Sequence, residues 1–381
     1  MRVIERVRVS HGGDPLLGRV LEVRTSVDDF ETPTRTPTST ELNARARLHF
    51  DEPWDNTVFE VVNRFDDRSP VHLLHRRNGV FAQRRRVLAS MVERFKGYSV
   101  VKYFPQVPHD TSLDGRDVRS LVDLQVEAGC DIISIPEPSA GCSVQELEGN
   151  LQRMWEYVQS TDGDLAVIPY ISLRQDHELF EAKLRLLREF PRDLWCIGIR
   201  AASFSEYRPN LYSLAEGCDQ DQWVHLSGGR RYTSHRRPNG QLHALQRFGV
   251  DTVSVEVPQG GGFRVRDPGM IRYFERGSCT YPRVAELVQG DRPLPCECPM
   301  CRSMRFPDLV SDVRPLGPED ELVLRVNDAF RVHEVYSSTM EFEVSRDVIR
   351  NGMLEDYYSG KAGLREYSFP SYVRTASLDD F

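Results

Sequence analysis

The sequence predicts an α/β protein: a (β/α)8 TIM barrel followed by a C-terminal zinc-binding subdomain. Three observations lead to this fold class. Short apolar runs alternate with amphipathic helical segments, eight such runs can be counted, and a cysteine cluster follows the last of them. Strand and helix in alternation are typical of βα units and a parallel sheet. Eight units favour a closed barrel over an open doubly wound sheet.

The individual elements follow from the spacing of apolar residues. An N-terminal hairpin precedes a first barrel strand near residues 33–38, and residues 76–96 are predicted to form a basic amphipathic helix. The other predicted strands are 58–62, 99–104, 131–135, 165–171, 195–199, 223–226 and 251–257. The other predicted helices are 118–128, 144–159, 177–189, 205–216 and 242–248. Functional groups are then expected just after the carboxyl ends of the strands.

The length fits one large domain with an appendage. We expect a barrel over residues 1–290, a zinc-binding subdomain with a closing helix over 291–360, and a tail over 361–381, with a linker near 310–320. These 381 residues are 40% hydrophobic, which is enough for one large core. No GxGxxG motif follows the first strand, so a dinucleotide-binding fold is unsupported.

Composition narrows the classes of function. The net charge of −8 argues against a protein that grips nucleic acid over its whole surface, although it leaves room for a local basic groove. No run of 18 apolar residues exists, and the N-terminal residues have no apolar signal region. We therefore predict a soluble, cytoplasmic protein without a membrane partner.

The most specific motif is a metal-binding one. Cys296, Cys298 and Cys301 lie within six residues, and three thiols so close together can wrap one tetrahedral zinc ion. His333 is favoured as the fourth ligand because the apolar stripe of its segment turns it inward at the start of a helix. Four protein ligands leave no position for water, so this zinc would be structural. A disulfide or an accidental cluster is the alternative.

The barrel with this cysteine motif and a histidine-bearing helix resembles the guanine transglycosylase superfamily. That superfamily includes tRNA-guanine transglycosylases and DNA-modifying 7-deazaguanine transglycosylases. Local stretches that resemble family segments are residues 30–33, 129–133, 272–281, 294–301, 333–336 and 349–355. The resemblance spans about residues 17–360. The C-terminal RNA-binding domains of the archaeal enzymes have no counterpart here, which favours DNA over tRNA as the polymer.

The resemblance implies a base exchange. A carboxylate attacks C1′ of the nucleotide, guanine leaves, and a 7-deazaguanine such as preQ0 or preQ1 displaces the enzyme from the sugar. Glu137 falls where the family places a carboxylate that reads the guanine edge, and Gly198 matches a backbone contact to the base. An exposed Glu in a proline loop and a packing Gly are the alternatives. Family members dimerise through the zinc region, which makes a homodimer plausible.

The catalytic positions depart from the family pattern. Ser254 occupies the position of the nucleophilic Asp, and Glu256 lies two residues further on the same face of the strand, so Glu256 is the candidate nucleophile. The second acid is replaced by Lys102, and Asp110 is the nearest substitute. These departures leave a second reading open: a catalytically inactive subunit that binds nucleic acid or a catalytic homologue. A metal-dependent hydrolase ranks last because clustered His and Asp at strand ends are missing.

A basic segment offers a nucleic-acid face. Arg230, Arg231 and Tyr232 follow the strand at 223–226, and Arg264 follows the next strand. Arginines on this rim would hold phosphates while the tyrosine stacks on a base. A solvated, charged loop is the alternative for each cluster.

Overall fold

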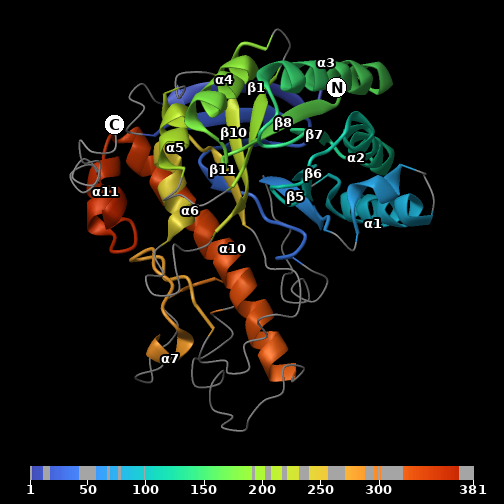
Figure 1. The fold of residues 1–381 in the computed structure, drawn as a ribbon. Helices are drawn as coiled ribbons and strands as arrows, with labels where there is room; N and C mark the ends of the chain where they lie inside the picture. Colours follow the sequence, from blue (N-terminus) through green and yellow to red (C-terminus); the bar gives the residue numbers. More distant parts are fainter. Residues whose placement is uncertain are drawn as a thin grey trace. The chain divides into compact units, whose positions relative to one another are not determined.

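The computed structural model describes residues 2–11, 18–42, 57–66, 69–75, 79–97, 99–190, 194–201, 207–216, 221–230, 240–255, 271–287, 296–298, 301 and 321–368 (Figure 1). The chain forms two compact units. Unit 1 comprises residues 1–39, 54–229 and 246–255, and unit 2 comprises 40–53, 230–245 and 256–381. Residues 271–287, which precede the expected boundary at 290, cluster with unit 2. The expected linker at 310–320 lies outside the described residues.

Unit 1 is organised around an eight-stranded sheet whose described pairings are all parallel. Its strands run in the order β4-β11-β10-β9-β8-β7-β6-β5. They are β4 (Thr34–Arg35), β5 (Thr57–Arg64), β6 (Ser99–Gln106), β7 (Ile132–Pro136), β8 (Ala166–Ser172), β9 (Cys196–Arg200), β10 (Trp223–Gly229) and β11 (Thr252–Val255). The sheet curls, and a parallel bridge from Thr38 to Glu60 links its two edges. The predicted α/β class with eight parallel strands is confirmed, and the curled sheet is compatible with a (β/α)8-like barrel.

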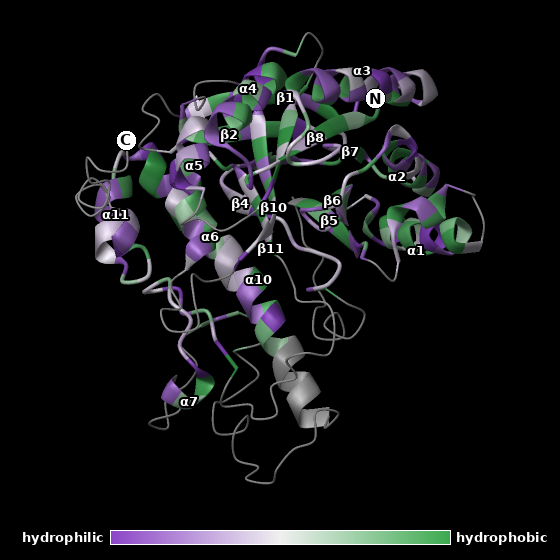
Figure 2. Cartoon of the chain, viewed as in Figure 1, coloured by the Kyte–Doolittle hydropathy of each residue, from purple (hydrophilic) through white to green (hydrophobic). Residues whose placement is uncertain are grey.

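Helices follow most of these strands, and α1 to α4 lie against the sheet. The helices of unit 1 are α1 (Gly79–Phe95), α2 (Gly115–Ala128), α3 (Val144–Thr161), α4 (His177–Arg188), α5 (Arg208–Ala215) and the 3-10 turn η2 (Val71–Leu74). Helix α6 (Gln241–Ala244) belongs to unit 2 and is followed in the chain by the 3-10 turn η3 (Leu245–Phe248). These helices carry hydrophilic residues beside hydrophobic ones (Figure 2), as expected for helices with one face on a sheet. Among the described residues, no helix is both long enough and apolar enough to cross a membrane.

Local signals explain where the helices begin. Asp114 caps α2 through the amides of Arg116 and Asp117, and Ser143 caps α3 through the amide of Glu146. Both are capping boxes, in which the third helical residue reaches back to the cap. The capping box at Asp114 starts α2 three residues before the apolar pattern predicted. The segment predicted as one helix over 242–248 is instead the short α6 followed by η3.

A three-stranded antiparallel sheet packs at the amino-terminal end of the parallel strands. It consists of β1 (Ile4–His11), β2 (Val20–Thr25) and β3 (Asp29–Glu31), and its apolar residues share one buried cluster with residues of the parallel strands, most of them near the strand starts. Phe30 packs edge-on against Trp223 at 5.6 Å between ring centroids. Arg19 forms a buried, bidentate ion pair with Asp251. The opposite, carboxyl-terminal end therefore carries the loops that can form a site.

Unit 2 is built on the long helix α10 (Glu321–Arg350), with α7 (Val284–Leu287), α11 (Leu354–Gly360) and the turn η5 (Arg365–Tyr367). Glu341 on α10 is buried, and its carboxylate accepts from Tyr357 at 2.5 Å and pairs with Lys361 at 2.7 Å and Arg276 at 3.3 Å. Two cations and a hydroxyl on one buried carboxylate join three separate segments of this unit.

Candidate active-site pocket and metal centre

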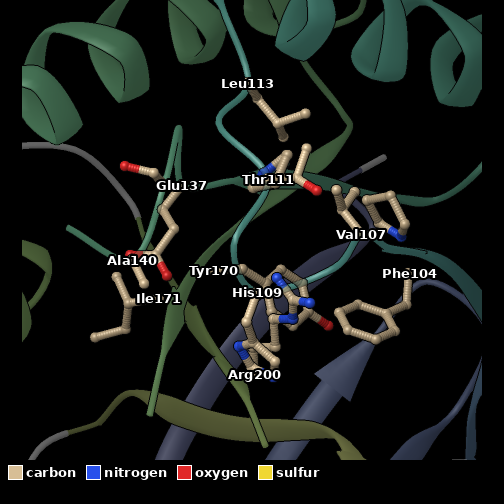
Figure 3. Close-up of a pocket in the computed structure, with 13 residues that line it drawn as sticks. Phe104, Val107, His109, Thr111, Leu113, Glu137, Ala140, Tyr170, Ile171 and Arg200 are labelled. Carbon is tan, nitrogen blue, oxygen red and sulfur yellow. The ribbon is translucent and has the colours of Figure 1, made fainter. Parts of the chain in front are cut away.

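A pocket opens at the carboxyl ends of β6 to β9, where a parallel α/β sheet places its site (Figure 3). Its walls include the aromatic rings of Phe104 and Tyr170 and the polar side chains of His109, Glu137 and Arg200. The lining thus combines apolar residues with a small number of polar side chains, which also include Thr111 and Ser139, as small-molecule sites do.

Glu137 is the buried carboxylate of this pocket. It is 9% exposed and directly follows β7. Oε1 accepts from the backbone N–H of Ser172 at 2.6 Å, and Oε2 accepts from the Lys183 ammonium at 3.2 Å. A carboxylate has about four acceptor positions, so two remain for a ligand. Burial raises the pKa of Glu137, and the positive charge of Lys183 offsets part of that rise.

Lys183 holds Glu137 in place. This lysine on α4 is fully buried, and its ammonium also donates to the Ala140 carbonyl at 2.9 Å and to Gln175 Oε1 at 2.8 Å. All three ammonium donors are therefore used, and the carboxylate has a fixed position.

His109 lines the pocket, whereas the neighbouring Asp110 does not. His109 Nδ1 lies 3.2 Å from Ser172 Oγ, which itself accepts from the Arg174 amide at 3.1 Å. Burial, together with the charges of Arg200 and Arg174, lowers the pKa of His109 to about 4. Its imidazole is accordingly neutral near pH 7. The Asp110 side chain is 89% exposed and lies 3.7 Å from Arg174.

Tyr170 and Gly198 stand opposite each other on β8 and β9. The Tyr170 ring covers Gly198 so closely that a Cβ at position 198 would lie 2.7 Å from two ring carbons. Gly198 therefore provides the space into which the ring packs. Phe104 lies beside Tyr170 at 5.2 Å between centroids, tilted by 39°.

A buried ionic network joins side chains of several strands and contacts Tyr170, which lines the pocket. Lys102 on β6 contacts the carboxylate of Glu60 on β5, and both side chains are fully buried. Lys102 Nζ also reaches Tyr170 Oη at 2.5 Å and Ser227 Oγ at 3.2 Å. Ser254 Oγ donates to Glu60 Oε1 at 2.5 Å. Two of the predicted catalytic residues, Lys102 and Ser254, thus belong to one network.

The network fixes the charges of its members. Burial alone would raise the pKa of Glu60, but the positive charge of Lys102 and a hydrogen bond from His225 outweigh it and hold that pKa well below its usual value. Burial, and then the neighbouring Lys102, lowers the pKa of His225 to about 4. Glu60 is therefore an anion near pH 7, and His225 is neutral.

The remaining predicted site residues are dispersed or lie elsewhere. Arg230 is exposed after β10. Glu256, Arg231, Tyr232 and Arg264 lie outside the described residues, so their proposed roles stay predictions. In the part of the chain that the structure describes, Glu137 is the predicted carboxylate that lines the pocket.

The cysteine motif and His333 come together in unit 2. The ligand atoms of Cys296, Cys298, Cys301 and His333 all lie within 4.8 Å of one another. His333 Nδ1 is 3.5 Å from Cys298 Sγ and 3.2 Å from Cys301 Sγ. Atoms bound to one tetrahedral metal ion at about 2.0–2.3 Å lie roughly 3.5–3.8 Å apart. The four residues can therefore hold a metal ion.

Surrounding groups orient these ligands as metal sites require. His333 Nε2 lies 2.9 Å from the Phe274 carbonyl, which accepts its proton and leaves Nδ1 free to face the thiols. Tyr273 stacks on the imidazole at 4.1 Å, with 15° between the planes. The Cys298 amide points to Cys296 Sγ at 3.4 Å, and the Cys301 amide points to Cys298 Sγ at 3.3 Å.

Sequence reasoning missed Glu60, His109, Tyr170, Arg200, His225 and Ser227. A usable signal was present, because a polar residue at the inward position of an otherwise apolar strand indicates a buried polar centre. Glu60 stands among valines, and His225 stands between Trp223 and Ser227 in alternate positions. Partners on different strands could not be matched from this pattern alone.

No known protein family matches the sequence, and no curated protein is significantly similar to it.

Proposed function

We propose that this protein is a zinc-braced (β/α)8 transglycosylase that replaces guanine in DNA or tRNA by a 7-deazaguanine such as preQ0 or preQ1. The observation that carries the proposal is the pocket at the carboxyl ends of β6 to β9, which Glu137, Phe104 and Tyr170 all line. A carboxylate with two open acceptor positions suits the ring N–H and exocyclic amine of guanine. The rings of Phe104 and Tyr170 supply apolar surface for a planar base.

The exchange proceeds through a glycosyl-enzyme intermediate. A carboxylate oxygen forms a bond to C1′ as the C1′–N9 bond breaks, and guanine leaves with the electron pair and takes up a proton. The incoming 7-deazaguanine then loses its N9 proton, bonds to C1′ and releases the carboxylate. Glu256 is the proposed nucleophile. Glu137 holds the base through hydrogen bonds, and the base must leave its stack to reach the pocket.

Zinc would brace the fold in this proposal. Cys296, Cys298, Cys301 and His333 supply four ligands, so the ion would have no open position for substrate or water. It would keep α10 joined to the cysteine segment and take no part in base exchange.

Incorporation of labelled guanine and labelled preQ0 into DNA and into tRNA tests the proposal. Wild-type protein should incorporate label into one of the polymers. Glu256→Gln should abolish incorporation, and Glu137→Gln should reduce it at least tenfold by raising KM for the base. Glu148→Gln, on the outer helix α3, is the matched control and should be neutral. Incorporation that survives Glu256→Gln would remove Glu256 from the mechanism.

A second function is favoured by a different observation. Lys102 and Ser254, which stand at the family's catalytic positions, are both fully buried against Glu60. That arrangement suits an inactive subunit that binds nucleic acid or a catalytic homologue. Tight binding of guanine-containing DNA or tRNA without incorporation of label would select this function over base exchange.

A further inference from the structure

Tyr170 connects the pocket to the buried ionic network. Tyr170 is among the residues that line the pocket although it is only 3% exposed, and its hydroxyl bonds to Lys102 Nζ at 2.5 Å and to Ser227 Oγ at 2.7 Å. The ring also packs on the backbone at Gly198. The pocket wall at this point is therefore held by groups that do not line the pocket.

The direction of each hydrogen bond follows from counting protons. Ser227 has one hydroxyl proton, which it donates to Glu60 Oε2 at 2.6 Å. Tyr170 must therefore donate its own proton to Ser227 Oγ. Lys102 has no acceptor atom, so it donates to the oxygen of Tyr170. The tyrosine hydroxyl thus makes one bond as donor and one as acceptor, and both fix the orientation of the ring.

The acceptor and donor roles of its neighbours also decide which ring nitrogen of His225 carries the proton. His225 Nε2 lies 3.1 Å from Glu60 Oε2, and an ionised carboxylate can only accept, so Nε2 carries the proton. His225 Nδ1 therefore accepts from the Thr252 hydroxyl at 2.7 Å, and the threonine oxygen accepts from Trp223 Nε1 at 2.6 Å. Glu60 accepts from Lys102, His225, Ser227 and Ser254, which accounts for about four acceptor positions. Glu60 is also fully buried, so it presents no surface to a ligand.

We propose that the Glu60–Lys102 pair is a positioning device: it fixes Tyr170 as the wall on which the planar base of the substrate stacks, although neither charged group touches that base. This inference rests on the proposed function for the identity of the ligand as a purine or 7-deazapurine. The buried pair thereby affects the affinity for the base through the hydroxyl of Tyr170.

Binding of guanine and of 7-deazaguanine, measured by titration calorimetry, tests the inference without any need for catalysis. Tyr170→Leu removes the ring and should weaken binding about fivefold or more, the range found for loss of one stacking contact. Tyr170→Phe keeps the ring but removes both hydroxyl bonds, and should weaken binding about threefold. Tyr157→Leu, on the outer helix α3, is the matched control and should bind as wild type does.

A double-mutant cycle separates positioning from general stability. The pair is neutralised together in Lys102→Met/Glu60→Gln, so that no lone charge is left buried. Adding this double change to the wild-type protein should weaken guanine binding. Adding it to the Tyr170→Phe variant should weaken guanine binding no further. Equal weakening in both backgrounds would show a merely structural role and overturn the inference.

The single Tyr170→Phe variant decides the matter even if the double variant fails to fold. Unchanged guanine affinity in Tyr170→Phe, with an unchanged circular dichroism spectrum, would overturn the inference. So would failure of the wild-type protein to bind either base. Binding that follows the predicted pattern without any incorporation of label would contradict the proposed reaction but support the positioning role.

Discussion

Tyr170 packs over Gly198 on the neighbouring strand, and its ring occupies the space that a side chain at position 198 would fill. This contact joins two features of the site. The ring forms one wall of the pocket, and its hydroxyl reaches the buried pair of Glu60 and Lys102.

Gly198→Ala should destabilise unit 1. Its Cβ would lie 2.7 Å from carbons of the Tyr170 ring, so the ring or the strand must shift. The free energy of unfolding should fall by about 1–3 kcal/mol, as for other overpacked cores, and guanine binding should weaken because the ring is displaced. Urea denaturation measures the first effect. Gly149→Ala on α3, where a Cβ meets nothing closer than 4.0 Å, should be neutral or stabilising.

Lys102→Met should lower the free energy of unfolding much more than neutralising both members of the Glu60–Lys102 pair. The single change leaves the fully buried Glu60 without its cation, which typically costs about 3–5 kcal/mol. Lys102→Met/Glu60→Gln should recover part of that loss, since no buried charge is then left unpaired. Comparison of the two variants by urea denaturation checks this order, and equal stability of the two would contradict it.

The stability of unit 1 should fall as the pH drops from about 6.5 to 4. The pKa of His225 is lowered to about 4 in the folded protein, against about 6.5 when unfolded, so over this range the unfolded chain binds the extra proton. The full shift corresponds to about 3 kcal/mol, lost progressively as the pH falls. The variant His225→Asn should remove the contribution of His225 to this slope, while the contribution of His109, whose pKa is also lowered to about 4, should remain. His177→Asn, a change at a partly exposed histidine on α4, should leave it unchanged.

Metal analysis of the purified protein should find about one zinc ion per chain. Cys298→Ser should lose the metal, because a cluster with three remaining ligands binds zinc much more weakly. Cys130→Ser, at a buried cysteine outside the cluster, should retain it. Chelation of the wild-type protein should lower the melting temperature of unit 2. Equal zinc content in both variants would contradict the assignment of the ligands.

Local patterns in the sequence were enough to predict most of the elements and the grouping of the three cysteines with His333. Period-two and helical patterns reflect burial along each strand and helix, so the strands near 99–104, 131–135 and 195–199 could be assigned locally. The cysteines lie within six residues, and three thiols so close in sequence have little choice of partner. The apolar stripe correctly predicted that His333 turns inward, but its predicted place at the start of a helix is wrong, because α10 begins at Glu321 and His333 lies well inside it.

Only the tertiary structure decided which polar groups meet inside the sheet. Glu60 and Lys102 are 42 positions apart, and Ser254 lies 194 positions from Glu60, yet the register of the curled sheet places all three in one buried network. The same register puts Tyr170 opposite Gly198, and the loop after β6 leaves Asp110 exposed while His109 lines the pocket. The physical reason is that a lone strand fixes only the face on which a side chain lies, whereas its partners across the interior depend on how neighbouring strands align.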